Sequence, residues 1–454
     1  MRRAEFILPS SFFMKSAFAI VLALTAATAW TGGQTPTPTV TAFVGVHVVP
    51  MDRDTVLRDQ TVVIRDGRIA TLGARGRVPI PAAATQVPAA GKYLMPALAE
   101  MHAHIPGGNA PDDAIERVLF LYAAHGIGTI RGMLGDPRHL AFRDRVAKGE
   151  LVSPRIYTSG PSLNGNSVPT KEAAIQAVTS QKAAGYDLLK IHPGVERDPF
   201  DALAAKAHEV GIDFAGHVPL AVGLHRALEA RYRSIDHLDG YIEALSKTPM
   251  QSQFFGINLV NDVDESKIPA LVQQTKKAGT WMVPTQILFE NLMTDEDPLE
   301  MAKRPEIRFQ EPQDAVQKWI AQTQMFQKKI PAADRARFLA VRRRILKALY
   351  DAGVPFALGS DAPQVWNVPG YSTHRELQAL VDAGLTPYQA LRTGTVDVGR
   401  YFGAKDSGTI AEGHRADLIL LEANPLERIG NSTRIAGVVL AGRWLSREEL
   451  RPKE

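Results

Sequence analysis

The chain has 454 residues, 45% of them hydrophobic and 22% charged, a globular composition that excludes disordered, collagen-like and coiled-coil proteins. A net charge of +4 with scattered Lys and Arg argues against nucleic acid as a partner, and the absence of cysteine excludes disulfides and thiolate metal ligands. The length suits a barrel of roughly 300 residues with a modest second domain.

Residues 1–29 are predicted to be a secretory signal peptide. Lys15 precedes the apolar run 17–24, and the small residues that follow place cleavage after Ala29. Met14 is an alternative initiator, because it stands directly before Lys15. The apolar run is shorter than the roughly 20 residues that span a bilayer. We therefore expect an exported protein, periplasmic or secreted, with no stable membrane insertion.

A Thr/Pro-rich linker (30–39) leads into β-rich sequence at residues 40–94, where apolar and polar residues alternate around the turn signal Asp66-Gly67. The C-terminal stretch, 403–454, has the same style, with short strands expected at 416–421 and 435–443. We expect the two ends of the chain to pair into one small β-sandwich domain.

Residues 95–402 alternate short apolar strands with helical patterns, which predicts an α/β fold and a (β/α)8 TIM barrel. Eight strands are expected, over 93–102, 126–131, 155–160, 186–191, 212–217, 234–237, 280–285 and 355–361. Helices are expected at 170–184, 199–210 and 221–230. The interval 287–347 is longer than one crossover needs, so it is predicted to hold extra helices near the barrel mouth. Its basic run, Arg342 to Arg344, is interpreted as the exposed face of a helix.

Polar residues stand at the carboxyl ends of five of these strands, the face on which barrel enzymes place catalysis. They are His102 and His104, Lys190, His217, His237 and Asp361. Two histidines two positions apart on a strand share a face and can bind one ion. Taken singly, each residue is better explained by a structural role, such as an internal salt bridge for the lysine. Their joint placement indicates a metal site.

At these residues the sequence resembles the amidohydrolase superfamily, in its imidazolonepropionase-like and Xaa-Pro dipeptidase-like branch. The matching segments are 95–104 (MPALAEMHAH), 189–192 (LKIH), 215–219 (AGHVP), 234–238 (SIDHL), 358–361 (LGSD) and 408–418 (GTIAEGHRADL). Two departures are mild: Ala97 stands where glycine is usual, and Glu100 where aspartate is commoner. Glu100 is expected to alter the support of the neighbouring histidines.

The resemblance implies a binuclear centre, with two Zn²⁺ per chain and Mn²⁺ or Co²⁺ as alternatives. It implies His102 and His104 on the more buried ion, His217 and His237 on the more exposed one, and a carboxylated Lys190 bridging both. Asp361 would touch the buried ion and the shared water, accept the proton of the attacking hydroxide and pass it to the leaving amine.

Other residues have weaker claims. Tyr241 is a candidate donor to the developing oxyanion, with a core or surface tyrosine as the alternative. Arg131, at the end of the second strand, could grip a substrate carboxylate. His192 points the same way as Lys190, although a place in the pocket wall explains it equally. Asn164 and Asn166 belong either to the pocket or to a simple turn.

The leading hypothesis is a hydrolase of carbon–nitrogen bonds that cleaves the amide of a dipeptide or N-acyl amino acid, as an Xaa-Pro dipeptidase or carboxypeptidase does. One alternative is a mononuclear enzyme of the imidazolonepropionase type, which opens a cyclic amide or deaminates a heterocycle and in which Lys190 is structural. A second is a non-catalytic periplasmic binding protein. The expected partner is a small molecule or dipeptide, and a homo-oligomer is compatible with the sequence.

Overall fold

The computed structural model describes residues 40–248, 252–310 and 314–451. The predicted signal peptide and linker lie outside the described residues. None of the helices within these ranges is both long and apolar enough to cross a membrane.

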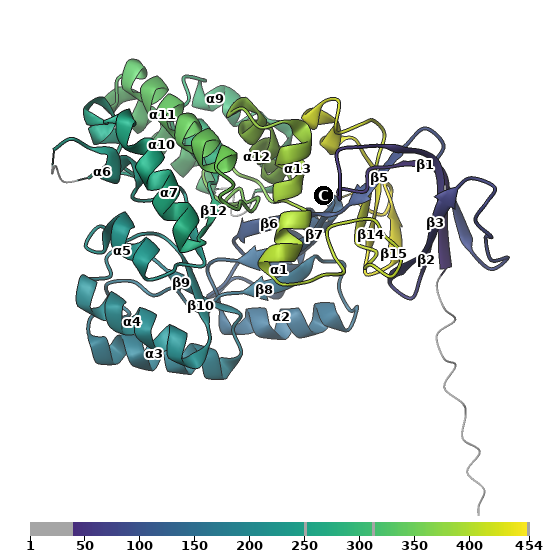
Figure 1. Ribbon diagram of the computed structural model, residues 1–454, viewed down its shortest axis with the longest axis horizontal. Helices are drawn as coiled ribbons and strands as arrows, with labels where there is room; N and C mark the ends of the chain where they lie inside the picture. The colour runs from purple at the N-terminus through teal and green to yellow at the C-terminus, as the bar shows by residue number, and fades with distance from the viewer. Residues whose placement is uncertain (1–39, 249–251, 311–313, 452–454) are drawn as a thin grey trace, which may run out of the picture. The chain divides into compact units, whose positions relative to one another are not determined.

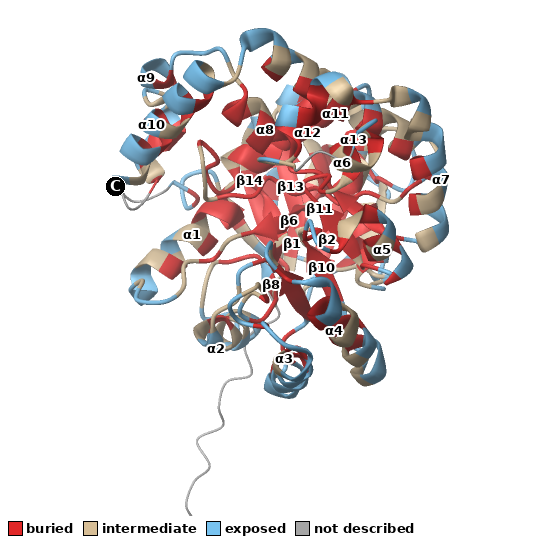
Figure 2. Cartoon of the chain, turned by 90° about the vertical axis from the view of Figure 1, so that its left-hand side faces the viewer, coloured by how far each residue is buried: buried red, intermediate tan, exposed pale blue. Residues whose placement is uncertain are grey.

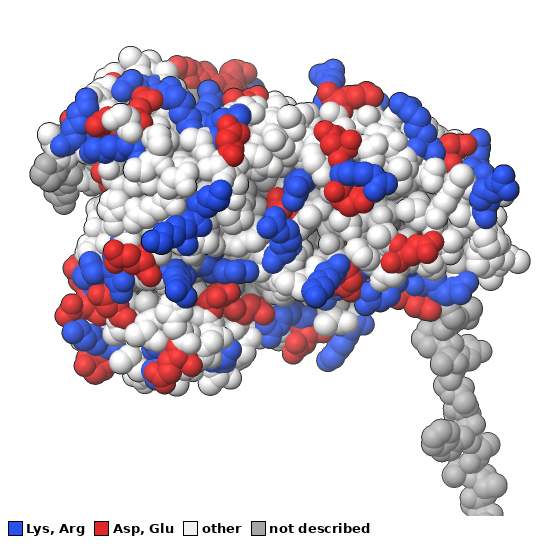
Figure 3. Space-filling model, viewed as in Figure 1, with Lys and Arg blue, Asp and Glu red and all other residues white. Residues whose placement is uncertain are grey.

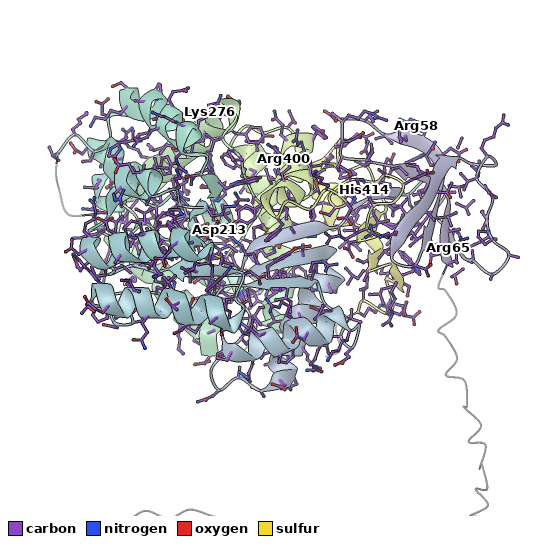
Figure 4. All side chains as sticks on the ribbon, turned by 60° about the horizontal axis from the view of Figure 1, so that its bottom comes forward. Arg58, Arg65, Asp213, Lys276, Arg400 and His414 are labelled. Carbon is purple, nitrogen blue, oxygen red and sulfur yellow. The ribbon has the colours of Figure 1, made fainter. Side chains whose placement is uncertain are left out.

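Strands from both ends of the chain form one eight-stranded sheet, in the order β15-β14-β13-β5-β1-β2-β3 with β4 beside β1 (Figure 1). The strands are β1 Val40–Val48, β2 Leu57–Arg65, β3 Arg68–Ala74, β4 Thr85–Pro88, β5 Tyr93–Pro96, β13 Leu418–Leu421, β14 Ile435–Leu440 and β15 Arg443–Ser446. Asp66 (φ 50°) and Gly67 (φ 76°) make the two-residue turn between β2 and β3, so the predicted hairpin is confirmed. Arg58 and Arg65 mark the two ends of β2 in Figure 4.

The chain leaves this sheet at Ala97. The sequence predicted one strand over 93–102, but β5 pairs with β1 and β13, whereas β6 (Leu98–Ala103) pairs with β7. Between them the Ala97 N–H donates to the carbonyl of Asp417, and the Leu98 N–H donates to the carbonyl of Gly126. The single predicted strand is therefore wrong, because its two halves find partners in different sheets.

Parallel strands carry the rest of the chain. A three-stranded sheet holds β6, β7 and β8, and a four-stranded sheet holds β9 to β12. Their bounds are β7 Ile127–Gly132, β8 Arg155–Thr158, β9 Leu188–Ile191, β10 Asp213–Gly216, β11 Ser234–Asp236 and β12 Trp281–Val283. Parallel bridges then join Ser159 to Leu188, Met282 to Phe356, and Ala103 to Ala362. The predicted eighth strand is thus a segment held by single bridges, and the α/β class is confirmed.

Helices follow most of these strands and turn their exposed faces outward around the buried strands (Figure 2). They are α1 Asp112–Ala124, α2 Pro137–Ala147, α3 Lys171–Ala184, α4 Arg197–Val210, α5 Gly223–Glu229, α6 Tyr241–Leu245, α7 Ile268–Ala278, α8 Gln286–Leu292, α9 Pro298–Met301, α10 Asp314–Lys329, α11 Ala332–Asp351, α12 Tyr371–Asp382, α13 Pro387–Thr393 and α14 Val396–Tyr401. Helix α3 begins where sequence signals place it: the Thr170 hydroxyl accepts from the Ala173 N–H at 3.2 Å, and Gly185 (φ 85°) ends the helix.

The interval after β12 contains the extra helices expected there, α8 to α11. Basic and acidic side chains are interspersed over the face drawn in Figure 3, which agrees with the small net charge. The run Arg342 to Arg344 differs from its interpretation as an exposed face. Arg343 pairs with Glu290 near the surface, but Arg342 is only 1% exposed. The helix turns this residue inward, toward the strand ends.

Candidate metal centre

The six residues singled out from the sequence meet at the carboxyl ends of the parallel strands. His102 lies on β6 and His104 just beyond it, Lys190 lies on β9, and His217 and His237 directly follow β10 and β11. Asp213 begins β10, and Figure 4 marks this opposite end of the strand. The carboxylate of Asp361 is the common neighbour: Oδ1 lies 2.7 Å from His104 Nε2 and 3.5 Å from His102 Nε2. Its Oδ2 lies 3.6 Å from His237 Nδ1.

The remaining contacts complete one cluster. Nζ of Lys190 is 3.2 Å from Nε2 of His102, and the ring centroids of His102 and His237 are 4.6 Å apart. His217 stacks on His237 at 4.5 Å. All six predicted metal residues therefore lie in contact with at least one other member of the set.

Burial controls the charges in this cluster. It lowers the pKa of His217 to about 3 and the pKa values of His102 and His237 well below the usual range, with the Lys190 cation adding to the effect. Burial likewise lowers the pKa of Lys190. It opposes ionisation of Asp361, but the attraction of His102 and the hydrogen bond from His104 outweigh it and hold that pKa below its ordinary value. Neutral imidazoles and one carboxylate result, which are the forms that bind metal.

A metal ion fits this donor set. Nε2 of His237 is buried and has no hydrogen-bond partner among the residues that the structure describes, while Nδ1 contacts the Thr285 hydroxyl at 2.8 Å. An imidazole fixed through one nitrogen with its other nitrogen unpaired is typical of a metal ligand. The ligand atoms of His102, His237 and Asp361 all lie within 4.8 Å of one another. Imidazole and carboxylate donors suit Zn²⁺, with Mn²⁺ and Co²⁺ as substitutes.

Two aspartates support the histidines, and sequence reasoning gave them no role. Oδ2 of Asp239 lies 2.7 Å from Nδ1 of His217, and Oδ2 of Asp236 lies 2.8 Å from Nδ1 of His102. Burial raises the pKa of Asp239 to about 8, against the opposing pull of the Lys190 cation. The Asp239 contact is a hydrogen bond that fixes Nδ1 of His217. The Asp236 contact places a carboxylate oxygen beside Nδ1 of His102, whose Nε2 faces Lys190 and Asp361. The usable signal was the pair of acidic residues flanking a strand-end histidine in the segment 234–239.

Glu100 ties the first strand to the segment before Asp361. Its Oε1 accepts from the N–H groups of His102 (3.0 Å) and Ser360 (2.8 Å). Its Oε2 accepts from the hydroxyls of Ser360 (2.7 Å) and Thr373 (2.8 Å). The side chain is fully buried, and burial raises its pKa to about 7 despite these donors. This departure from aspartate thus places a longer carboxylate between two ligand-bearing segments.

Arg131 takes a different place from the one expected. Its guanidinium is fully buried and donates to the Met101 carbonyl (2.6 Å) and to the hydroxyls of Ser234 (2.9 Å) and Tyr401 (2.8 Å). Its remaining nitrogen lies 3.2 Å from the carboxylate of Asp236. Because protein groups engage its donors, Arg131 orients Asp236 rather than gripping a substrate carboxylate.

Tyr241 also differs from its expected role. Its hydroxyl is buried and contacts the Thr275 hydroxyl at 2.7 Å and the Met282 sulfur at 3.5 Å, so it serves the core instead of an oxyanion. The ring of His192 lies 5.0 Å from that of His217, at the edge of the cluster. Asn164 accepts from the backbone N–H groups of residues 166 and 167, which is the simpler turn interpretation.

Comparison with known proteins finds a family of hydrolases and several of their solved structures. Residues 93–445 match the Amidohydrolase family. An ochratoxinase of Aspergillus niger is 25% identical over 407 residues, which cover 82% of this chain and 79% of the relative. In fold, the chain is similar to the bottromycin amidohydrolase AH (TM-score 0.68, 23% identity, 91% of this chain and 89% of that chain). It is also similar to an Xaa-Pro dipeptidase with bound methionine in the active site (TM-score 0.65, 19% identity, 90% and 100%).

Proposed function

Because the chain belongs to the amidohydrolase family and is a hydrolase of amide carbon–nitrogen bonds, we propose that the cluster around Asp361 is its metal-dependent active site. The observation that carries this proposal is the convergence of His102, His104 and His237 on the buried carboxylate of Asp361. Lys190 lies beside His102, and His217 stacks on His237.

We propose that the eight parallel segments close into the (β/α)8 barrel and that residues 40–94 and 403–454 form a β-sandwich beside it. In support, hydrogen-bonded bridges run from each parallel segment to the next and from the last, at Ala362, back to β6. A cluster at the carboxyl ends of such strands lies on the face where barrel enzymes carry out catalysis.

The proposed centre holds two Zn²⁺ ions. His102 and His104 would bind one, His217 and His237 the other, and a carboxylated Lys190 would bridge them. An amine must be unprotonated to add to carbon dioxide, and burial favours that form of Lys190. The nitrogen then bonds to the carbon of carbon dioxide and releases one proton, which leaves an anionic carbamate with two oxygen ligands. When bound, metal ions of this kind polarise a carbonyl and lower the pKa of water to near 7.

The side chains then have separate tasks. Asp361, anionic and central, accepts a proton from the attacking water as the water oxygen bonds to the amide carbon. It returns that proton to the nitrogen as the carbon–nitrogen bond breaks, so that the products are a carboxylate and an amine. Asp236 and Asp239 hold the rings of His102 and His217 in orientation. Because Asp361, His102 and His237 are buried, their interactions are stronger than they would be in water.

For the substrate, we propose a dipeptide or an N-acyl amino acid. The names of the structural relatives, an Xaa-Pro dipeptidase and a bottromycin amidohydrolase, support an amide or peptide bond as the target. Because residues 1–29 resemble a secretory signal peptide, we propose that the enzyme acts outside the cytoplasm.

One observation favours a second candidate. His102, His237 and Asp361 already offer three ligand atoms within 4.8 Å of one another. A mononuclear enzyme that opens a cyclic amide or deaminates a heterocycle would use this triplet alone.

The test is a substrate screen of the purified protein together with metal analysis. We expect about two ions per chain and hydrolysis within a panel of dipeptides, N-acyl amino acids and cyclic ureas. One ion per chain with turnover only of the cyclic compounds would favour the second candidate. Asp361→Asn is the control, and undiminished turnover in that variant would contradict the role of the carboxylate.

A further inference from the structure

Arg342 reaches the candidate centre from the extra helix α11, and its contacts are unusual for a buried cation. The side chain is 1% exposed. Its guanidinium donates to the carbonyl of His237 (2.8 Å), the carbonyl of Pro284 (3.2 Å) and the side-chain oxygen of Gln286 (3.0 Å). Cζ of the guanidinium lies 3.5 Å from the ring centre of Phe289. The groups that accept its hydrogen bonds are thus neutral.

A buried charge that faces neutral acceptors carries a desolvation cost that an ion pair would offset better. Arginine provides what a neutral residue cannot, a rigid planar fork with five donors that can hold several acceptors at fixed angles. Here the fork spans the carboxyl ends of β11 and β12, so it sets the spacing of two strand ends.

Those strand ends have strained backbone. His237 (φ 63°), Leu238 (φ 56°) and Thr285 (φ 45°) adopt left-handed conformations that side chains of these types rarely take. Each such residue carries a conformational cost and persists only where its surroundings enforce it. Arg342 bonds the carbonyl of His237 and that of Pro284, the residue before Thr285, which are the peptide groups that adjoin the strained residues.

Thr285 also fixes the orientation of the His237 ring. The Thr285 hydroxyl contacts Nδ1 at 2.8 Å and leaves the buried Nε2 without a partner among the described residues. If the two strand ends shifted apart, this contact would break and the ring could turn away from the cluster.

We propose that Arg342 is a positioning residue, which by holding the carbonyls of His237 and Pro284 keeps the imidazole of His237 in place at the metal centre. It acts through His237 and Thr285 and touches neither substrate nor metal. The inference rests on the proposed function, since it takes His237 as a metal ligand.

The test compares the full-length wild type with R342K and R342Q, and uses R344Q as the matched control. Lysine keeps the charge but presents a point donor in place of the fork. Arg344 lies two positions along the same helix, pairs with Glu265 and is largely exposed, so its loss removes only a surface ion pair. Zinc affinity is measured by competition with a chromophoric chelator, and the visible absorption spectrum of the Co²⁺-loaded proteins reports on the ligand geometry.

We expect R342K and R342Q to bind zinc about 10- to 100-fold more weakly, as the loss of groups that orient metal ligands does elsewhere, and to show a shifted Co²⁺ spectrum. R344Q should match the wild type in both. Wild-type affinity and an unchanged spectrum in R342K and R342Q would overturn the inference while leaving the metal centre intact. Loss of the folded far-UV signal of both variants at saturating metal would assign Arg342 to the core and overturn it as well. A wild type that binds no zinc would overturn the proposed function itself.

Discussion

Replacing Glu100 with alanine should destabilise the protein strongly. The carboxylate is fully buried and accepts hydrogen bonds from four donors, two N–H groups and two hydroxyls, which lie on β6, on the segment before Asp361 and on α12. A buried donor left without an acceptor costs about 1–3 kcal/mol. At the lower value, four donors give about 4 kcal/mol, a large share of the roughly 5–15 kcal/mol that stabilises an ordinary domain.

Two further variants separate size from charge. Glu100→Gln keeps one oxygen for the N–H groups of His102 and Ser360, and the two hydroxyls can rotate to accept from its amide, so we expect a loss of only about 1–2 kcal/mol. Glu100→Asp is one methylene shorter and cannot reach both sets of donors, so it should fall between the glutamine and alanine variants.

The measurement is urea unfolding of the metal-free protein, followed by circular dichroism, with the midpoint and slope fitted together. Glu209→Ala is the control, because Glu209 is exposed on α4 and forms a surface ion pair with Lys206, so its loss should change stability by less than about 0.5 kcal/mol. If the free energy of unfolding of Glu100→Ala lies within about 1 kcal/mol of the wild-type value, the four hydrogen bonds to Glu100 do not stabilise the fold as argued.

Three other predictions concern separate parts of the molecule. Asp239→Asn weakens the hold on the ring of His217, so zinc affinity by chelator competition should fall about 10- to 100-fold, and an unchanged affinity would count against the pairing. Thr170→Ala removes the N-cap of α3 and should lower the free energy of unfolding, measured in urea, by about 1 kcal/mol. No measurable change would mean that this hydrogen bond does not stabilise the protein. The hydrogen bond from Arg415 lowers the pKa of Asp406 from 3.8 to about 2, so this carboxylate stabilises the fold above pH 4 and loses its effect as the pH falls through 2. Asp406→Asn should therefore lower the melting temperature at pH 7, and the effect should be modest because the ion pair is partly exposed. The difference from the wild type should shrink toward pH 2; a difference that grows toward pH 2 would contradict the direction of this pKa shift.

Local signals in the sequence were sufficient for much of the fold. The pair Asp66-Gly67 predicted its hairpin because left-handed backbone at both positions suits those residues, and the periodic pattern over 170–184 predicted α3 closely. The clustering of the six candidate residues could be predicted because each stands at or just after the end of an apolar strand, and the carboxyl ends of parallel strands meet on one face.

The features that could not be predicted from the sequence depend on contacts between distant segments. The chain changes sheets at Ala97 because Asp417, far along the chain, supplies the acceptor for its N–H. Arg131 stands near the end of a strand, the position that suggested a substrate-binding arginine, yet its side chain is buried and pairs with Asp236. Arg342 sits in a run of three arginines, and only the position of β11 and β12 beside α11 decides which of the three is buried. Such choices follow from three-dimensional packing, which periodicity and composition do not record.

The central claim is that this amide hydrolase works through metal held by the histidines around Asp361. The most direct measurement is hydrolysis of an N-acyl amino acid or dipeptide substrate by protein stripped of metal with a chelator and then titrated with Zn²⁺. We expect activity to disappear on stripping and to return in proportion to bound zinc, to a plateau near two ions per chain. Full activity in protein shown to be free of metal would contradict it.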